Sequence, residues 1–385
     1  MLNAFKSRSL ATSAPLATGI LPWQPRGVAA LVNQDASEGN VHDRASRAVL
    51  LDRIASLLEQ PLLAPMGADE AAKTNALLVP GDALEEGAAT EAGIFDRSDI
   101  LGGVVPAFFI GTKGIAHGLV DENAQRPQEW SFEMARLLGD AALPGYTAFS
   151  HSDAAKAGRL LLAKGPVRIK DVCGKAGLGQ AVIRSEAELD AALALEDADD
   201  LARYGIVLEE NLADVVTYSV GVVELGGETI SYWGSQNLTT DHQGREVYAG
   251  SDLFVVRGGL AALAKLDLPE HVTQAVRCAA IFDRAAHAAY PDIILTRRNY
   301  DVIEGTDIHG DRRIGVLEQS WRVGGASGAE IAALEAFRAE PNTTQVRCST
   351  VEVYDIVTLP AGATLYYQGV DPVVGAMTKY AMRYA

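Results

Sequence analysis

A glycine-rich segment enclosed by two strand-like runs constrains the fold of this 385-residue chain more than any other feature. Residues 167–172 (VRIKDV) and 180–184 (QAVIR) alternate like half-buried strands, and the residues between them read CGKAGLG. Because a strand and not a helix follows the glycines, the segment is neither a G-x-x-x-x-G-K-S/T phosphate loop nor a dinucleotide-binding turn. By itself it is equally compatible with an ordinary glycine-rich hairpin and with a lid over phosphate groups.

Short apolar runs alternate with helical patterns along the rest of the chain, which predicts an α/β (α+β) fold. The paired glycines at 226–227 predict a hairpin turn. The runs that predict strands are residues 27–33, 76–80, 102–110, 205–209, 218–225, 230–235, 293–303, 314–318 and 346–359. The segments with helical spacing are residues 44–63, 129–138, 152–164, 185–203 and 269–290.

Charge and composition exclude several classes of protein. The chain carries 50 acidic against 33 basic side chains, a formal net charge of -17, so its surface repels nucleic-acid phosphates and anionic lipid headgroups. Neither a nucleic acid nor a membrane is therefore expected as a partner. Hydrophobic residues make up 48% of the chain, too many for intrinsic disorder, yet no apolar run is long enough to span a bilayer.

The cysteines, the histidines and the N-terminal residues bear on the cellular location and on the types of catalytic site that the chain can contain. Cys173, Cys278 and Cys348 are too few and too scattered for a disulfide framework or a cysteine-based metal cluster, which favours a reducing, cytoplasmic location. No histidine has the spacing of a zinc hydrolase site, and no G-x-S-x-G elbow is present. Residues 1–25 lack an apolar core before a cleavage site and are expected to be a loose tail.

Three groups of residues could carry chemistry. Lys170 and Lys175 flank the start of the glycine-rich segment, where two ammonium groups and free amides could neutralise phosphate oxygens. Residues 207–214 (VLEENLAD) end a predicted strand with acids, and they could serve a nucleobase and a ribose or simply be a solvated strand end. Asp301 and Glu318 lie on two predicted adjacent strands.

Two carboxylates on neighbouring antiparallel strands would suit Mg²⁺, which prefers oxygen ligands and bridges nucleotide phosphates. The alternative is a ladder of surface ion pairs. Arg322, four residues after Glu318, could bind a phosphate or a carboxylate with both arms of its guanidinium group.

A basic strand with a glycine turn, an acidic strand end and two strands with paired carboxylates follow one another in residues 143–328. In this order they resemble the ATP-grasp superfamily. The resemblance implies a nucleotide bound between two antiparallel sheets, and it implies a role for each matching residue. Lys170 would contact the α-phosphate and the adenine side, and Lys175–Gly179, with Gly177, would form the phosphate-covering loop. The hinge whose main chain reads adenine would be Glu209, Glu210, Asn211 and Leu212, and Asp214 would lie near the ribose. Asp301 and Glu318 would hold Mg²⁺, and Arg322 would lie near the transferred phosphate.

Two departures from the superfamily pattern are visible. Its Glu-x-Asn metal pair reads Glu318-Gln319-Ser320 here, so a serine hydroxyl replaces an amide ligand. The superfamily lysine expected just before Pro144 is missing, and Lys113 in GTKGIAHGL could supply it and bring His117 near the nucleotide. The alternative is a loop lysine and a histidine without a role. Residues 102–120 and 366–385 also resemble an uncharacterised bacterial family of ATP-grasp-like proteins.

The resemblance implies an ATP-dependent ligase that uses ATP and Mg²⁺ to join a small-molecule carboxylate to an amine or a thiol through an acyl phosphate. A nucleotide-binding regulatory or assembly subunit without ligase activity is the first alternative, and a protein with no nucleotide site is the second. Dimers are common in the superfamily, so a homodimer is compatible with the resemblance. The expected units are a tail (1–25), an N-terminal α/β domain (26–142), a small ATP-grasp subdomain (143–215), a large one (216–340) and a C-terminal closing segment (341–385).

Overall fold

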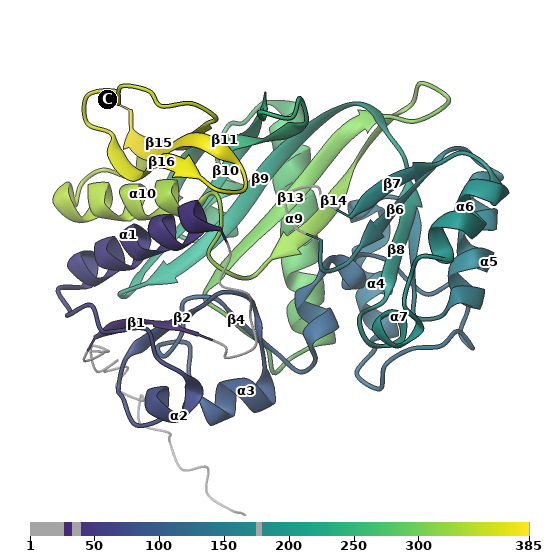
Figure 1. The fold of residues 1–385 in the computed structure, drawn as a ribbon, viewed down its shortest axis with the longest axis horizontal. Helices are drawn as coiled ribbons and strands as arrows, with labels where there is room; N and C mark the ends of the chain where they lie inside the picture. Colours follow the sequence, from purple (N-terminus) through teal and green to yellow (C-terminus); the bar gives the residue numbers. More distant parts are fainter. Residues whose placement is uncertain (1–26, 33–39, 175–178, 385) are drawn as a thin grey trace, which may run out of the picture.

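An eight-stranded antiparallel sheet forms the centre of the computed structural model, which describes residues 27–32, 40–174 and 179–384. In Figure 1 this sheet runs diagonally between the N-terminal elements and a smaller lobe. The strands in spatial order are β14 (Arg312–Ser320), β13 (Arg297–Thr306), β9 (Ala213–Leu225), β10 (Glu228–Thr240), β11 (Glu246–Arg257), β15 (Gln345–Val353), β17 (Gly375–Arg383) and β16 (Thr364–Asp371).

The hairpin between β9 and β10 shows why these long strands pair in a single register. Leu225 lies opposite Glu228, so Gly226 and Gly227 form a two-residue turn, and both have positive φ angles of 60° and 80°. Glycine adopts that backbone conformation without a Cβ clash, and such turns match the twist of the strands they join. The hairpin predicted at 226–227 is therefore confirmed.

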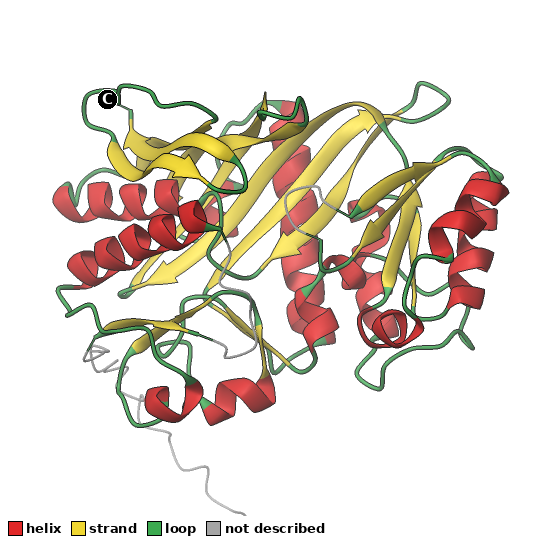
Figure 2. Cartoon of the chain, viewed as in Figure 1, coloured by secondary structure: helices red, strands yellow, loops and turns green. Residues whose placement is uncertain are grey.

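Helices cover both faces of the large sheet (Figure 2). Helix α9 (Glu270–Ala289) packs Phe282 and other apolar residues against Tyr300 and Val302 of β13. On the opposite face, α1 (Val41–Leu58) and α10 (Ser327–Ala339) form a second core with β10, β11 and β15. Asp301 alternates with Tyr300 and Val302 along β13, so it points away from α9.

A separate four-stranded antiparallel sheet forms the smaller lobe at the right of Figure 1. Its helices bury an apolar face of this sheet through Ile169, Leu189 and Leu208, while Lys170 points to the other face. The strands are β5 (Gly145–Ala148), β8 (Ile206–Glu210), β6 (Val167–Asp171) and β7 (Gln180–Ile183), and the helices are α5 (His151–Leu162), α6 (Glu186–Leu193) and α7 (Ala198–Tyr204).

Two small sheets lie below the large one, the first made of β1 and β2 and the second of β3 and β4 with β12 from later in the chain. Strands β1 and β2 pair in parallel, and α1 connects the end of β1 to the segment before β2. The bounds are β1 (Val28–Leu31), α2 (Ala68–Ala71), β2 (Leu77–Pro80), β3 (Leu84–Glu85), α3 (Glu86–Glu91), β4 (Gly103–Val105), η1 (Phe108–Gly111), η2 (Lys113–Ala116), α4 (Phe132–Leu138), η3 (Gly139–Ala141), α8 (Leu260–Leu263) and β12 (Ile294–Leu295).

Two predicted elements differ in the structure. The helix expected over 185–203 is two helices, because the Asp197 side chain accepts from the amides of Asp199 and Asp200 and caps the start of α7. The strand expected over 102–110 ends at Val105, since Pro106 cannot continue the hydrogen-bond ladder. A 3₁₀ turn follows it at Phe108–Gly111.

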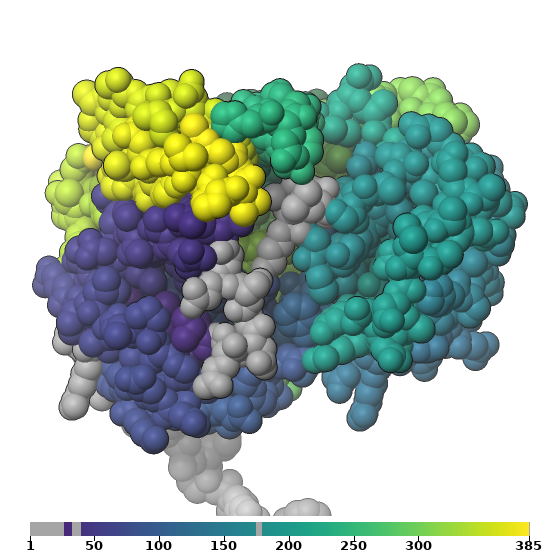
Figure 3. All heavy atoms as spheres, in the orientation of Figure 1, coloured from purple at the N-terminus to yellow at the C-terminus, as the bar shows by residue number. Residues whose placement is uncertain are grey.

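The segment 341–385, expected as a C-terminal closing segment, supplies β15, β17 and β16 to the large sheet. Strand β15 pairs with β11, and β16 packs on α1 from the opposite end of the chain, as the yellow and purple surfaces show in Figure 3. The boundary expected between residues 215 and 216 falls inside β9. None of the helices in the described part of the chain has the length and apolarity that crossing a bilayer requires.

Candidate functional site

Asp301 and Glu318 lie directly opposite each other on β13 and β14. A β-bulge follows Asp301, so Val302 pairs with Val316 and the register shifts by one residue beyond the two carboxylates. Burial and the repulsion of Glu318 raise the pKa of Asp301 to about 6. Asn299 Nδ2 donates to Asp301 Oδ1 at 2.7 Å, and Ser219 Oγ lies 3.4 Å from the same oxygen.

Lys113 joins the N-terminal elements to this carboxylate pair. Its Nζ lies 2.8 Å from Glu318 Oε2 and donates to the carbonyl of Gly174 at 2.9 Å. The side chain is only 4% exposed, because η2 packs against β14. One ammonium group therefore bridges a metal-type carboxylate and the start of the glycine-rich segment.

Lys170, Glu209 and His117 form a second, fully buried cluster in the smaller lobe. The Lys170 ammonium contacts Glu209 Oε1, and His117 Nε2 lies 3.1 Å from Glu209 Oε2. Lys170 and Glu209 are each 1% exposed. Burial lowers the pKa of Lys170, against the attraction of Glu209 and Glu318. The negative charge of Glu318 acts to raise the pKa of Lys170, so the charges of the two clusters influence each other.

Glu209 makes the stability of the smaller lobe depend on acid pH. Burial raises its pKa, but the charge of Lys170 and the hydrogen bond from His117 outweigh burial and lower the pKa from 4.5 to about 2. A carboxylate with a lowered folded pKa stabilises the protein above its unfolded pKa and loses that contribution as pH falls toward the folded value. We expect about 3 kcal/mol of stability to disappear between pH 4.5 and pH 2.

Urea unfolding of the wild type and of Glu209→Gln at pH 5, 4 and 3 measures this effect. The difference in unfolding free energy between the two proteins should shrink as the pH falls. A difference that stays constant over this range would show that Glu209 is not ionised against Lys170 and His117.

The hinge residues have diverse surroundings. Glu210 pairs with Arg313 at 3.6 Å, and Asn211 Oδ1 accepts from Arg168 at 2.9 Å, so both side chains are occupied within the protein. Leu212 is buried in a small apolar cluster. Asp214 is exposed in β9 with a positive φ of 50°, and no hydrogen bond or ion pair joins it to the other described site residues.

The glycine-rich segment is described only at its two ends. Lys175 and Gly177, both expected in the phosphate-covering loop, lie outside the described residues. Gly179 has a positive φ of 72°, and its carbonyl accepts from the Asp171 amide at 2.8 Å. A side chain at this position would meet Asp171 at 2.9 Å, so the turn requires glycine there.

Ser320 and Arg322 lie next to a buried ion pair. Arg297 donates to Glu330 at 2.7 Å through Nη2, and its Nη1 donates to the carbonyl oxygens of Ser320 and Arg322. The same Nη1 lies 3.5 Å from Ser320 Oγ, and a positive group at that distance opposes a cation on the serine hydroxyl. The Arg322 guanidinium lies 3.6 Å from Asp82 Oδ1.

The structure thus brings together six of the residues expected from the sequence, in two adjoining clusters. Sequence reasoning did not include the side chains around Asp301. Asn299 lies two residues away on the same strand, a spacing that was available as a signal. Gln236 donates to Ser219 at 3.1 Å and comes from the next strand, which no local pattern indicates. The six residues are Lys113, His117, Lys170, Glu209, Asp301 and Glu318, whereas Arg322 lies apart from both clusters, beside Asp82.

The surroundings of Asp301 and Glu318 suit a hard divalent cation. Two opposed carboxylates gain from a shared cation, the more so because the pKa of Asp301 is raised, and the side chains around Asp301 supply a hydroxyl and amides, while the Lys113 ammonium group contacts Glu318. Within the described residues no three His, Cys, Asp or Glu side chains gather as a metal site. Mg²⁺ typically binds one or two carboxylates and takes its other ligands from water and phosphate, so two carboxylates suffice.

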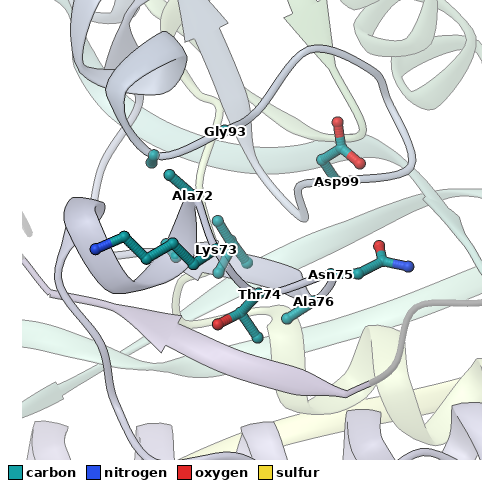
Figure 4. Close-up of a pocket in the computed structure, with 10 residues that line it drawn as sticks. Ala72, Lys73, Thr74, Asn75, Ala76, Gly93 and Asp99 are labelled. Carbon is teal, nitrogen blue, oxygen red and sulfur yellow. The ribbon is translucent and has the colours of Figure 1, made fainter.

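A surface cavity of about 310 Å³ lies elsewhere, in the N-terminal elements (Figure 4). It is lined by residues including Lys73, Thr74 and Asp99, which precede β2 or approach it from the side. Ligands of parallel α/β units bind beyond the carboxyl ends of the strands, whereas this cavity lies at the amino end of β2. It therefore belongs to neither cluster.

Several solved structures share the overall architecture of this chain. Biotin carboxylase from Campylobacter jejuni, in complex with β,γ-ATP, matches with a TM-score of 0.53 and 14% identity, over 94% of this chain and 88% of that chain. Phosphoribosylglycinamide synthetase from Anaerococcus prevotii matches with a TM-score of 0.51 and 11% identity, over 93% and 94%. Carboxyaminoimidazole ribonucleotide synthase from Aspergillus clavatus, in complex with ATP, matches with 0.50 and 14%, over 94% of both chains.

These neighbours are ATP-grasp enzymes, so the chain has an ATP-grasp fold, and the mixed α and β class with antiparallel sheets is confirmed. At identities of 11–14% the likeness concerns the fold alone. No protein with a curated description matches the sequence. A family model described as "Protein of unknown function (DUF3182)" matches residues 30–381, and the chain belongs to this family.

Proposed function

We propose that the protein is an ATP-dependent ligase that joins a carboxylate to an amine or a thiol through an acyl phosphate and releases ADP and phosphate. The observation that carries the proposal is the juxtaposition of the Asp301–Glu318 pair with Lys113 and Lys170. It supplies two carboxylates for a cation and two ammonium groups for phosphate oxygens. The fold is one in which solved neighbours hold ATP or MgADP.

The reaction requires little covalent chemistry from the protein. An oxygen of the substrate carboxylate attacks the γ-phosphorus, the bond to the bridging oxygen breaks, and ADP leaves with that electron pair. The nucleophile then attacks the acyl carbon, phosphate leaves, and the nucleophile gives up one proton. Positioning and charge neutralisation supply the rate enhancement, so no enzyme nucleophile takes part.

Each cluster has a distinct task in this reaction. Lys170 and Lys113 would neutralise phosphate oxygens, and Arg322 would stabilise the charge that develops during transfer. Asp301 and Glu318 would hold Mg²⁺, which when bound polarises the phosphate oxygens as a Lewis acid. Glu209 is held by Lys170 and His117, so its task is to keep the Lys170 side chain in place rather than to bind substrate.

The hinge offers a backbone group for a nucleobase. The Glu210 amide donates to Pro144 at 2.8 Å, and the Asn211 amide donates to Pro166 at 3.1 Å. No backbone hydrogen bond to another described residue uses the amide of Leu212. That N–H is the hinge donor that an adenine ring nitrogen would accept.

A thermal melt with ATP, ADP or GTP, each with and without Mg²⁺, tests the proposal. We expect ATP with Mg²⁺ to raise the melting temperature, because a ligand that binds only the native state stabilises it by mass action. Lys170→Gln should reduce this rise, since a buried ammonium group is lost from the phosphate site. The exposed lysine variant Lys156→Gln on α5 is the matched control and should keep it. No rise with any nucleotide at millimolar concentration would contradict the proposal.

Ser320 supports a second candidate, a nucleotide-binding protein without ligase activity. The guanidinium group of Arg297 lies beside its hydroxyl, so the third metal ligand of the superfamily pattern is absent. ATP binding without substrate-dependent ADP release across a panel of carboxylates and amines would favour this candidate.

A further inference from the structure

Two guanidinium groups from distant parts of the chain meet at the end of β2. Arg47, on α1, donates from Nη2 to the carbonyl of Val79 at 2.6 Å. Its Nη1 lies so close to Gly81 that a Cβ at that residue would be 3.0 Å away. Arg322, beyond β14, lies 3.6 Å from Oδ1 of Asp82. Both arginines therefore contact the same turn, residues 79–82.

Two basic side chains and one acidic side chain of the described residues lie at this turn. No carboxylate of the described residues forms an ion pair with Arg47, although the side chain is half-buried. Burial lowers the pKa of Arg47, and the charge of Arg322 lowers it further. Asp82 is the carboxylate beside Arg322. The two arginines and Asp82 together carry a formal charge of about +1.

The turn lies at the carboxyl ends of two parallel strands, a position where ligands commonly bind. Strands β1 and β2 are parallel and end at Leu31 and Pro80, and ligands of such units bind beyond the carboxyl ends of the strands. Arg322 follows β14 four residues after Glu318. The arginine pair therefore lies between the N-terminal unit and the strand that carries the proposed metal carboxylate.

We propose that Arg47 and Arg322 together bind a carboxylate group of the substrate. Two like charges are held near each other here, and an anion between them would remove their repulsion. Guanidinium groups bind carboxylates with two parallel hydrogen bonds, and neither arginine makes such a pair within the described residues. A carboxylate carries one negative charge, which matches the formal charge of about +1 on Arg47, Arg322 and Asp82.

This inference rests on the proposed ligase function for the identity of the ligand as a substrate, since a ligase of this type needs a carboxylate near the transferred phosphate. The site itself is defined by residues of α1, β2 and the end of β14. Arg47 lies on α1 and belongs to neither of the two clusters that are proposed to bind the nucleotide. Its substitution should therefore change the affinity for the carboxylate substrate without loss of nucleotide binding.

The test measures binding of acetate, the smallest carboxylate probe, by thermal melts at constant ionic strength. Sodium acetate up to about 100 mM replaces sodium chloride, and sodium phosphate is run in parallel. The wild type should show a saturable rise in melting temperature with acetate. Arg47→Gln should weaken the apparent acetate affinity by about tenfold or more, since a charged hydrogen bond is lost.

Three further variants sharpen the result. Arg47→Lys should recover only part of the affinity, because an ammonium group cannot bind both carboxylate oxygens side by side. Gly81→Ala should weaken acetate binding less than Arg47→Gln does, because the new Cβ would lie 3.0 Å from Nη1 and shifts the guanidinium group only slightly. Arg277→Gln on the exposed face of α9 is the matched control and should behave as the wild type.

The outcomes separate this inference from the proposed ligase function. An equal acetate response in the wild type and Arg47→Gln, or no saturable response in either, would overturn the carboxylate site. If Arg47→Gln weakened the response to phosphate more than the response to acetate, the choice of a carboxylate would be overturned. Arg47→Gln should keep the Mg²⁺-ATP response of the wild type. If the wild type binds acetate through Arg47 but shows no response to any nucleotide, the ligase proposal fails and the carboxylate site stands.

Discussion

Glu318→Gln is expected to remove the magnesium-dependent part of ATP binding and to slow ATP turnover by on the order of 10²–10⁴-fold. The substitution keeps the volume of the side chain and leaves an oxygen that can accept from Lys113 Nζ, now 2.8 Å away. It removes the charge that faces Asp301 across the two strands. The loss should therefore appear in cation binding and catalysis and not in folding.

Melts with ATP, with and without Mg²⁺, measure the first effect, and ADP release measures the second. In the variant the rise in melting temperature should be the same with and without Mg²⁺. Glu246→Gln, at the exposed start of β11, is the matched control and should keep the full Mg²⁺ increment. Wild-type turnover in a folded Glu318→Gln protein would sink the assignment of Glu318 as a metal ligand.

The pairing of β13 with β14 could be predicted from the sequence because it depends only on residues close together in the chain. Alternating apolar residues indicated two strands, and the polar loop between them indicated that they are neighbours, so Asp301 and Glu318 were expected on adjacent antiparallel strands. The structure pairs them directly. The register depends on the bulge after Asp301, which no pattern of apolar residues reveals because it moves only one residue.

Contacts between distant elements were harder to predict. Lys113 was expected near the nucleotide only from a missing superfamily lysine, and its ion pair with Glu318 joins residues about 200 positions apart. Glu209 was expected in the hinge whose main chain would read adenine, and no sequence pattern indicated that its side chain is buried between Lys170 and His117. Such pairings depend on how the lobes pack, and residue periodicity carries no information about that packing.

The C-terminal strands show the same limit. Alternation over 346–359 predicted a strand, and β15 is present at Gln345–Val353. Its partner is β11, about 100 residues earlier, and β16 lies against α1 from the start of the chain. A strand pattern gives the faces of a strand but not its neighbours, so the extension of the large sheet to eight strands could not be derived.

Disruption of the buried ion pair between Arg297 and Glu330 should cause the largest loss of stability, about 3–5 kcal/mol for Glu330→Gln. Each side chain is 2% exposed, and Tyr232 also donates to Glu330 at 2.6 Å. Removing the negative charge leaves a guanidinium group buried without a counter-charge, which costs far more than the pair contributes. Urea unfolding of the wild type and the variant measures the difference.

A comparison of three further variants assigns the cause. Arg159→Ala, which breaks two ion pairs on the exposed surface of α5, should cost no more than about 1 kcal/mol. The double variant Arg297→Met/Glu330→Leu should be more stable than Glu330→Gln, because no buried charge remains. It should not reach the wild type, since Arg297 Nη1 also donates to the carbonyls of Ser320 and Arg322.

Those two carbonyl contacts connect stability to the site. Arg297 holds the backbone that carries Arg322, so Arg297→Met alone should weaken acetate binding at Arg47 and Arg322 while it leaves Lys113 and Glu318 in contact. Thermal melts of this variant with increasing acetate, each started at a temperature where the variant is fully folded, provide the readout. If the affinity for acetate equals that of the wild type, Arg297 stabilises the fold without positioning Arg322.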